Sequence, residues 1–96
     1  MTARFLEAAR DDLREAVAFY ESRQEGLGRR FLEEIRAAVR RIEELPEAWQ
    51  ALDAAFRRCR LRHFPYGVIY RARGDEVLIV AVANLHREPD HWKDRG

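Results

Sequence analysis

The hydrophobic positions in the first half of the chain recur at helical spacing. Apolar side chains return every three or four residues over residues 8–23 and again over residues 29–45, which predicts two amphipathic helices. Gly26 and Gly28 interrupt the pattern between them and permit the chain to reverse. Pro46 ends the second stretch, because proline cannot continue a helix. We therefore expect an antiparallel pair of helices.

In the second half the hydrophobic period changes from 3.6 to 2. Over residues 56–64, arginines alternate with Cys59 and Leu61, so one face of the predicted strand is cationic and the other can be buried. Residues 66–71 predict a second strand. Glu76–Asn84 is rich in Val and Ile and predicts a third strand, buried on both faces.

With a short edge strand expected at residues 3–7, the predicted element order is β-α-α-β-β-β. This order predicts an α+β fold in which the helical hairpin packs on one face of a small antiparallel sheet. A chain of 96 residues is expected to form one domain, residues 1–96.

The composition places the chain among globular proteins. A hydrophobic content of 47% excludes simple disorder. The only cysteine, Cys59, cannot form an internal disulfide, and this favours a reducing cytoplasm. The longest apolar run, residues 77–83, is too short to span a bilayer, so we expect no membrane association.

Charge is distributed unevenly along the chain. Residues 1–53 carry a net charge of −3 and residues 54–96 carry +4, although the whole chain is only +1. Six of the arginines fall between Asp53 and Asp75, and no acidic residue interrupts them. A small basic surface of this kind suits an anionic partner, either nucleic acid or an acidic protein segment.

The arginine row of the first long strand is the candidate functional surface. Alternate residues on a strand project from the same face, at a spacing close to that of successive phosphates along a nucleic acid strand. Arg58, Arg60 and Arg62 would then bind phosphates and stabilise charge that develops during phosphodiester cleavage. The alternative is a solvated outer face, on which arginine stems only cover apolar area.

Other chemistries lack the residues that they need. The sequence contains no phosphate-cradling glycine loop and no cysteine pair, and its histidines lack the spacing of a zinc site, so we expect neither a metal nor a cofactor. Ser22 is the only serine and lies within the first predicted helix, which argues against a serine nucleophile.

Several segments resemble the RelE/ParE superfamily of toxins from type II toxin–antitoxin modules. The likeness covers nearly the whole chain and is carried by Asp12-Leu13, Phe19-Tyr20-Glu21, Gly26-Leu27-Gly28, Arg30-Phe31, residues 42–46, Phe64-Pro65-Tyr66-Gly67-Val68-Ile69-Tyr70-Arg71, Ala81-Val82-Ala83, His86-Arg87, Pro89 and Trp92. The resemblance implies a compact α+β toxin, neutralised by an antitoxin whose C-terminal part wraps around it.

The resemblance implies two activities. RelE-type members cut messenger RNA on the ribosome, whereas ParE-type members poison DNA gyrase and lack most of the RelE catalytic set. Arg58 and Arg60 fall where RelE has two lysines, and Arg87 falls on its arginine after the last strand. Gly67 stands where RelE has an inner catalytic arginine. The C-terminal catalytic tyrosine of RelE has no counterpart here, because Trp92 or Lys93 stands at its position.

These departures favour the ParE-type activity. Arginine is always charged, so Arg58 and Arg60 can hold a phosphate but are poor proton acceptors. His86 is the better placed general acid or base, since His63 falls on the opposite strand face by period-2 counting.

We therefore expect a ParE-like toxin that inhibits DNA gyrase and is neutralised by a cognate antitoxin. The alternative is a RelE-like ribosome-dependent endoribonuclease acting on messenger RNA, with the catalytic residues Arg58, Arg60, His86 and Arg87. The residues expected to bind the target or the antitoxin are Arg58, Arg60, Arg62, Tyr70, Arg71, Arg87 and Trp92. We expect an amphipathic antitoxin helix to lie between the helical hairpin and the basic strand.

Overall fold

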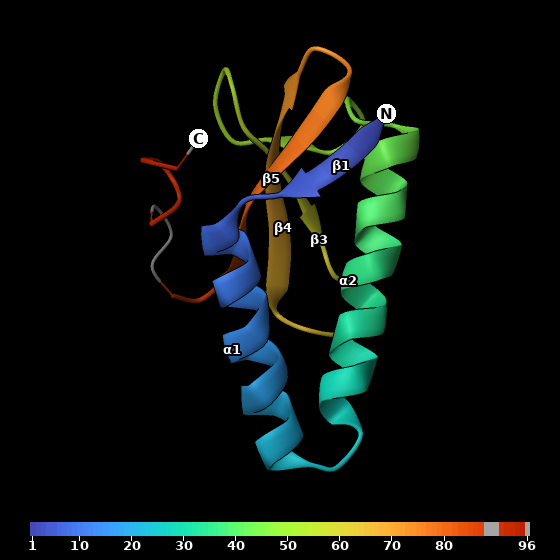
Figure 1. The fold of residues 1–96 in the computed structure, drawn as a ribbon, viewed down its shortest axis with the longest axis vertical. Helices are drawn as coiled ribbons and strands as arrows, with labels where there is room; N and C mark the ends of the chain where they lie inside the picture. Colours follow the sequence, from blue (N-terminus) through green and yellow to red (C-terminus); the bar gives the residue numbers. More distant parts are fainter. Residues whose placement is uncertain (88–90, 96) are drawn as a thin grey trace.

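The computed structural model describes residues 1–87 and 91–95 of the chain. Its elements, in chain order, are β1 (Thr2–Phe5), α1 (Glu7–Arg23), α2 (Leu27–Glu44), β2 (Gln50–Ala51), β3 (Arg57–Arg60), β4 (Tyr66–Arg73) and β5 (Glu76–Asn84). The predicted α+β class and element order are confirmed, with the two-residue strand β2 in addition. Figure 1 shows α1 and α2 as an antiparallel hairpin on one side of the sheet.

The sheet has the strand order β1-β5-β4-β3-β2. Antiparallel pairing joins β3 to β4 and β4 to β5, as predicted, and also joins the additional strand β2 to β3. Strand β1 is the exception, because it pairs with β5 in parallel, with Thr2 opposite Glu76 and Phe5 opposite Ile79. The sheet is therefore mixed: β1 and β5 run in the same direction, and every other pair of neighbouring strands runs in opposite directions.

The turn between the helices depends on two glycines and one carboxylate. Gly26 has φ +89°, in the left-handed region that favours glycine. A Cβ at Gly28 would lie 2.8 Å from the carbonyl oxygen of Val17, so a larger residue would push the helices apart. The carboxylate of Glu21 accepts the N–H groups of Gly26 and Gly28, each at 3.0 Å.

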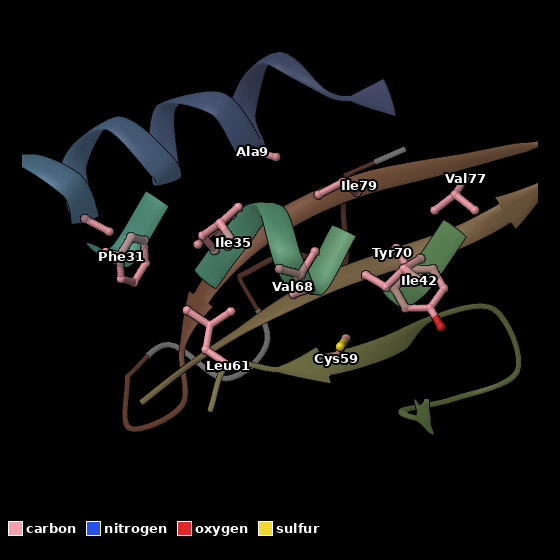
Figure 2. Close-up of a cluster of buried hydrophobic side chains, with 13 residues drawn as sticks. Ala9, Phe31, Ile35, Ile42, Cys59, Leu61, Val68, Tyr70, Val77 and Ile79 are labelled. Carbon is pink, nitrogen blue, oxygen red and sulfur yellow. The ribbon is translucent and has the colours of Figure 1, made fainter. Parts of the chain in front are cut away.

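The main core lies between the helices and the sheet. Figure 2 shows side chains of α1 and α2 meeting those of β3, β4 and β5. The buried residues of this core are Ala9, Ala16, Phe31, Ile35, Ala38, Ile42, Cys59, Leu61, Val68, Tyr70, Val77, Ile79 and Val82. Burial of this apolar surface is the dominant favourable term in folding.

A second apolar cluster lies apart from this core. Its buried members are Phe56, Ile69, Leu78, Val80, Ala81, Ala83 and Trp92. The Trp92 ring packs edge-to-face on Phe56, with ring centroids 4.9 Å apart. Strand β5 contributes to both clusters, which confirms the prediction that it is buried on both faces.

Candidate functional site

Strand β3 separates two kinds of side chain. Cys59 points into the main core and is 1% exposed, whereas Arg58 is half-buried and Arg60 exposed. Because successive strand residues point to opposite faces, Arg58 and Arg60 share the face away from the helices. The predicted cationic face is thus present for these two arginines.

Arg58 lies across a glycine of the neighbouring strand. A Cβ at Gly67 would be only 2.8 Å from the Cγ and Cδ atoms of Arg58, so the absence of a side chain there makes room for the arginine stem. The guanidinium is held at its far end, where Nη2 donates a hydrogen bond of 2.8 Å to the Gln50 side chain on β2. Gly67 and Gln50 together fix the position of this cation.

The Arg58 guanidinium is short of acceptors. Its Nε is buried and has no hydrogen-bond partner among the residues that the structure describes. Burial lowers the pKa of Arg58, and the nearby charge of Arg60 lowers it further. A buried donor without an acceptor costs about 1–3 kcal/mol, and a bound anion would remove that cost as well as the repulsion between the two arginines.

A cavity of about 270 Å³ lies beside this guanidinium, and we call it the Arg58 hollow. It is lined by Leu52, Asp53, Arg58, Ile69, Ala83, Asn84, Leu85, Trp92 and Lys93. Apolar side chains form much of its wall, and Arg58, Lys93 and the Asn84 amide provide donors. The Asp53 carboxylate is already engaged, since it accepts the N–H groups of Ala55 and Phe56 at 2.8 Å each.

Arg62 does not continue the arginine row, contrary to the sequence prediction. Strand β3 ends at Arg60, so the period-2 alternation stops before residue 62. Instead, Arg62 lines a hollow against α2 together with His63. Glu34 of α2 holds this loop by accepting the N–H groups of Arg62 and His63 at 2.9 and 3.0 Å, and its other oxygen lies 2.6 Å from His63 Nδ1.

Two aromatic residues predicted at the binding surface are buried. Tyr70 is 1% exposed in the main core (Figure 2), where its hydroxyl donates a 2.6 Å hydrogen bond to the Pro46 carbonyl. Burial raises the pKa of Tyr70 to about 12. Trp92 is 4% exposed and packs on Phe56, so only one wall of the Arg58 hollow uses it. Neither ring is free to stack on a partner.

The remaining predicted residues lie around this region but not in one site. The Arg71 guanidinium lies 5.6 Å from the centre of the Phe56 ring. Arg87 and His86 are exposed beyond β5, and Arg87 lines a separate cavity of about 410 Å³, which we call the Arg87 hollow. The two hollows share Asn84, so Arg58 and Arg87 flank the end of β5 without lining one cavity.

Gln50, Leu52 and Lys93 were not predicted as site residues. Gln50 belongs to β2, which is only two residues long and leaves no periodic signal. Leu52 and Lys93 reach the Arg58 hollow from segments without regular strand or helix. In the sequence, nothing about the type or spacing of these three residues distinguishes them from residues elsewhere on the surface.

The helices carry a more apolar cavity of about 330 Å³, the hairpin hollow. It is lined by Phe5, Leu13, Leu32, Ile35, Arg36, Val39 and Arg40. By contrast, the hollow between α2 and the loop after β3, where we expected an antitoxin helix, is lined mainly by charged residues. The apolar hollow on α2 that is open to solvent therefore lies beside α1 and β1 and not beside the basic strand.

Two negative findings hold for the described parts of the chain. No helix within residues 1–87 and 91–95 is long and apolar enough to cross a membrane. No three side chains of His, Cys, Asp or Glu in these ranges gather where they could hold a metal ion. Pro89, one of the residues of the family resemblance, lies outside these ranges.

Comparison with protein families tests the resemblance to the RelE/ParE superfamily. The family described as "ParE toxin of type II toxin-antitoxin system, parDE" matches residues 3–89. The chain belongs to the ParE toxin family. The solved structure "Chromosomal ParDE TA system from P. aeruginosa" has the same fold as this ParE-family chain, with a TM-score of 0.75 and 17% sequence identity. That match covers 88% of this chain and 96% of the other, and no curated protein matches the sequence.

Proposed function

We propose that this ParE-family chain inhibits DNA gyrase in the cytoplasm and that a cognate antitoxin neutralises it. Family membership is the observation that carries this proposal. The surface around Arg58 supports a role in binding: its arginines can hold an anion or an acidic side chain, but they are poor proton acceptors. The observations therefore favour non-enzymatic inhibition over RNA cleavage.

Two surfaces suit the proposed antitoxin. The hairpin hollow is apolar and flanked by Arg36 and Arg40, which fits an amphipathic helix with acidic residues beside its apolar stripe. Arg58 and Arg60 offer a second, cationic surface for acidic residues further along the same partner. An antitoxin that reaches both would neutralise the toxin by covering its anion-binding face.

Purified protein distinguishes the two activities directly. Added to DNA gyrase and relaxed plasmid, it should reduce supercoiling in proportion to its concentration, and induced cells should filament while bulk messenger RNA stays intact. The cognate antitoxin should restore both supercoiling and growth. New transcript ends within codons, dependent on translation and mapped by primer extension, together with unimpaired gyrase, would replace this proposal with the endoribonuclease.

The role of the cationic surface is tested with a double variant that replaces both arginines by uncharged glutamines. Arg58→Gln with Arg60→Gln should abolish gyrase inhibition and leave the thermal transition nearly unchanged, because exposed or half-exposed arginines contribute little to stability. The matched control is Arg10→Gln with Arg14→Gln, which removes the same charge from the exposed face of α1. If both double variants inhibit gyrase as well as the wild type, the β3 surface has no part in the activity.

A further inference from the structure

The Arg87 hollow is larger than the Arg58 hollow and the hairpin hollow, and the proposed function assigns it no role. Its walls come from separate parts of the chain. Ala16 and Phe19 lie on α1, Tyr66 begins β4, and Val82 lies near the end of β5. Arg87 lines the hollow from the segment after β5.

Aromatic rings held in fixed positions form two parts of this lining. Phe19 is 43% exposed, whereas Tyr20, the next residue, packs against the main core. The Phe19 ring lies edge-on to Tyr20, with ring centroids 5.2 Å apart, and the Arg23 guanidinium lies 4.9 Å from its centre. Tyr66 also lies edge-on to Tyr20, with ring centroids 6.0 Å apart. The hollow thus has one ring on the α1 side and another on the β4 side.

Arg87 adds a positive charge to this aromatic lining. Its side chain is exposed. Burial raises the pKa of Tyr20, the neighbouring Tyr66 raises it further, and the charge of Arg87 acts in the opposite direction, so the guanidinium lies within electrostatic reach of these rings. A guanidinium in such a place can bind a carboxylate while the rings contact an apolar group.

The acidic residues of the hollow limit the charge that it accepts. Asp12 and Glu15 lie three residues apart on the same face of α1 and both line the hollow. The Asp12 carboxylate is engaged by Arg95 at 2.7 Å and by the Val82 N–H at 3.0 Å, but Glu15 is exposed. Nearby carboxylates repel a dianionic phosphate more strongly than a group with a single charge. The lining therefore favours one carboxylate over a polyanion such as nucleic acid.

We propose that the Arg87 hollow is a docking pocket for a peptide segment of a partner protein that carries an aromatic side chain beside a carboxylate. The aromatic ring contacts Phe19 and Tyr66, and the carboxylate pairs with Arg87. Ala16 and Val82, both buried, supply the apolar floor. Aromatic side chains that fill a pocket contribute much of the binding energy of many interfaces. The volume of about 410 Å³ lies within the range of pockets that bind small ligands.

Small probes test the pocket on the purified protein alone. N-acetyltryptophan carries both the ring and the carboxylate, N-acetyltryptophanamide lacks the charge, and N-acetylleucine lacks the ring. In amide NMR spectra, N-acetyltryptophan should shift the signals of Ala16, Phe19 and Val82 along one saturable curve. The other two probes should each bind about tenfold more weakly, because each loses one of the two contacts. Adenosine monophosphate, which joins a ring to a phosphate, should also bind more weakly than N-acetyltryptophan.

Two variants assign the contacts to side chains. Arg87→Gln should bind N-acetyltryptophan and its amide with equal affinity, because the partner of the carboxylate is gone. Phe19→Ala should weaken the binding of both probes about tenfold. Leu45→Ala is the matched control, since Leu45 is another exposed apolar residue and does not line the hollow, and it should bind like the wild type.

The comparison of probes on the wild-type protein decides the proposal even where a variant fails to fold. Absence of a saturable shift at these amides would overturn the pocket. Equal wild-type affinity for N-acetyltryptophan and N-acetylleucine would overturn the aromatic contact, and equal affinity for the acid and its amide would overturn the carboxylate contact. Tighter binding of adenosine monophosphate would assign the hollow to nucleic acid instead. None of these measurements involves gyrase, so their outcome is independent of the proposed function.

Discussion

At the scale of single residues, the position of Arg58 depends on the residue opposite its stem. The sequence identifies both Arg58 and Gly67 as unusual, but not that one lies over the other. That contact follows from the β3–β4 register, in which Arg60 is opposite Gly67 and Arg58 is opposite Ile69. Register is set by packing across the whole sheet, so a local pattern cannot supply it.

Gly67→Ala should reduce toxicity without removing any charge. The new methyl group would lie 2.8 Å from Arg58 Cγ and Cδ, so the stem must rotate away and carry the guanidinium out of the Arg58 hollow. The free energy of unfolding should fall by about 1–3 kcal/mol, because the methyl group crowds the half-buried stem of Arg58 and not its free end. Growth inhibition and thermal denaturation of the same variant measure the two effects.

A double-variant comparison separates this effect from any other consequence of the methyl group. If Gly67→Ala acts through Arg58, it should add almost nothing to the loss caused by Arg58→Gln. Additive losses of toxicity would show that the methyl group acts elsewhere.

At the scale of elements, single carboxylates connect the parts of the fold. Glu21 of α1 binds the first backbone N–H groups of α2, and Glu34 of α2 binds the loop that follows β3. The first nitrogens of a helix lack partners within the helix, so an outside acceptor stabilises it. The sequence could not predict the bonds of either carboxylate, because Glu21 and Glu34 lie on different elements from the N–H groups that they accept.

Glu21→Ala should destabilise the protein by about 0.5–2 kcal/mol, the usual range for loss of a helix N-terminal acceptor. Glu33→Ala is the matched control, since Glu33 is exposed on α2, and it should stay within about 0.5 kcal/mol of the wild type. Urea denaturation of the three proteins gives the comparison. Equal midpoints for Glu21→Ala and Glu33→Ala would show that the capping bonds contribute nothing.

The contact between Glu34 and the loop after β3 makes the stability of the protein depend on pH. Burial acts to raise the pKa of Glu34, but the bonds from His63 and the Arg62 N–H outweigh burial and hold the pKa below its usual 4.5. A carboxyl with a depressed folded pKa contributes stability above its unfolded pKa and loses it as pH falls through the folded value.

Glu34→Gln should therefore be less stable than the wild type at pH 7, and the gap should close as pH falls below about 4.5. Melting temperatures of the two proteins across this range measure it. A gap that stays constant with pH would mean that the carboxylate charge has no role in the contact.

At the scale of the whole molecule, the sequence predicted the elements that have a clear hydrophobic period. The two helices and β5 were found because long apolar repeats mark them. The parallel direction of β1, the early end of β3 and the short strand β2 were missed, since each depends on pairing between distant segments. For the same reason Tyr70 and Trp92 were placed at the surface: both rings are covered by parts of the chain far away in sequence.

Core packing should affect activity only through folding. Ile79 is fully buried at the centre of β5, and Ile79→Ala should cost roughly 2–5 kcal/mol because it leaves a cavity. Toxicity should then fall in step with the melting temperature, measured on the same preparations. Loss of activity in a variant that melts like the wild type would assign Ile79 a role beyond packing.

The pairing of β1 with β5 also sets when the protein can become active in a cell. Residues 2–5 can pair only with residues 76–79 of β5, so β1 cannot join the sheet until most of the chain has been synthesised. Such long-range pairing is the slow part of folding. On the proposed function, the chain would therefore be inactive for nearly the whole time of its translation, and a cognate antitoxin would meet the folded protein only at the end.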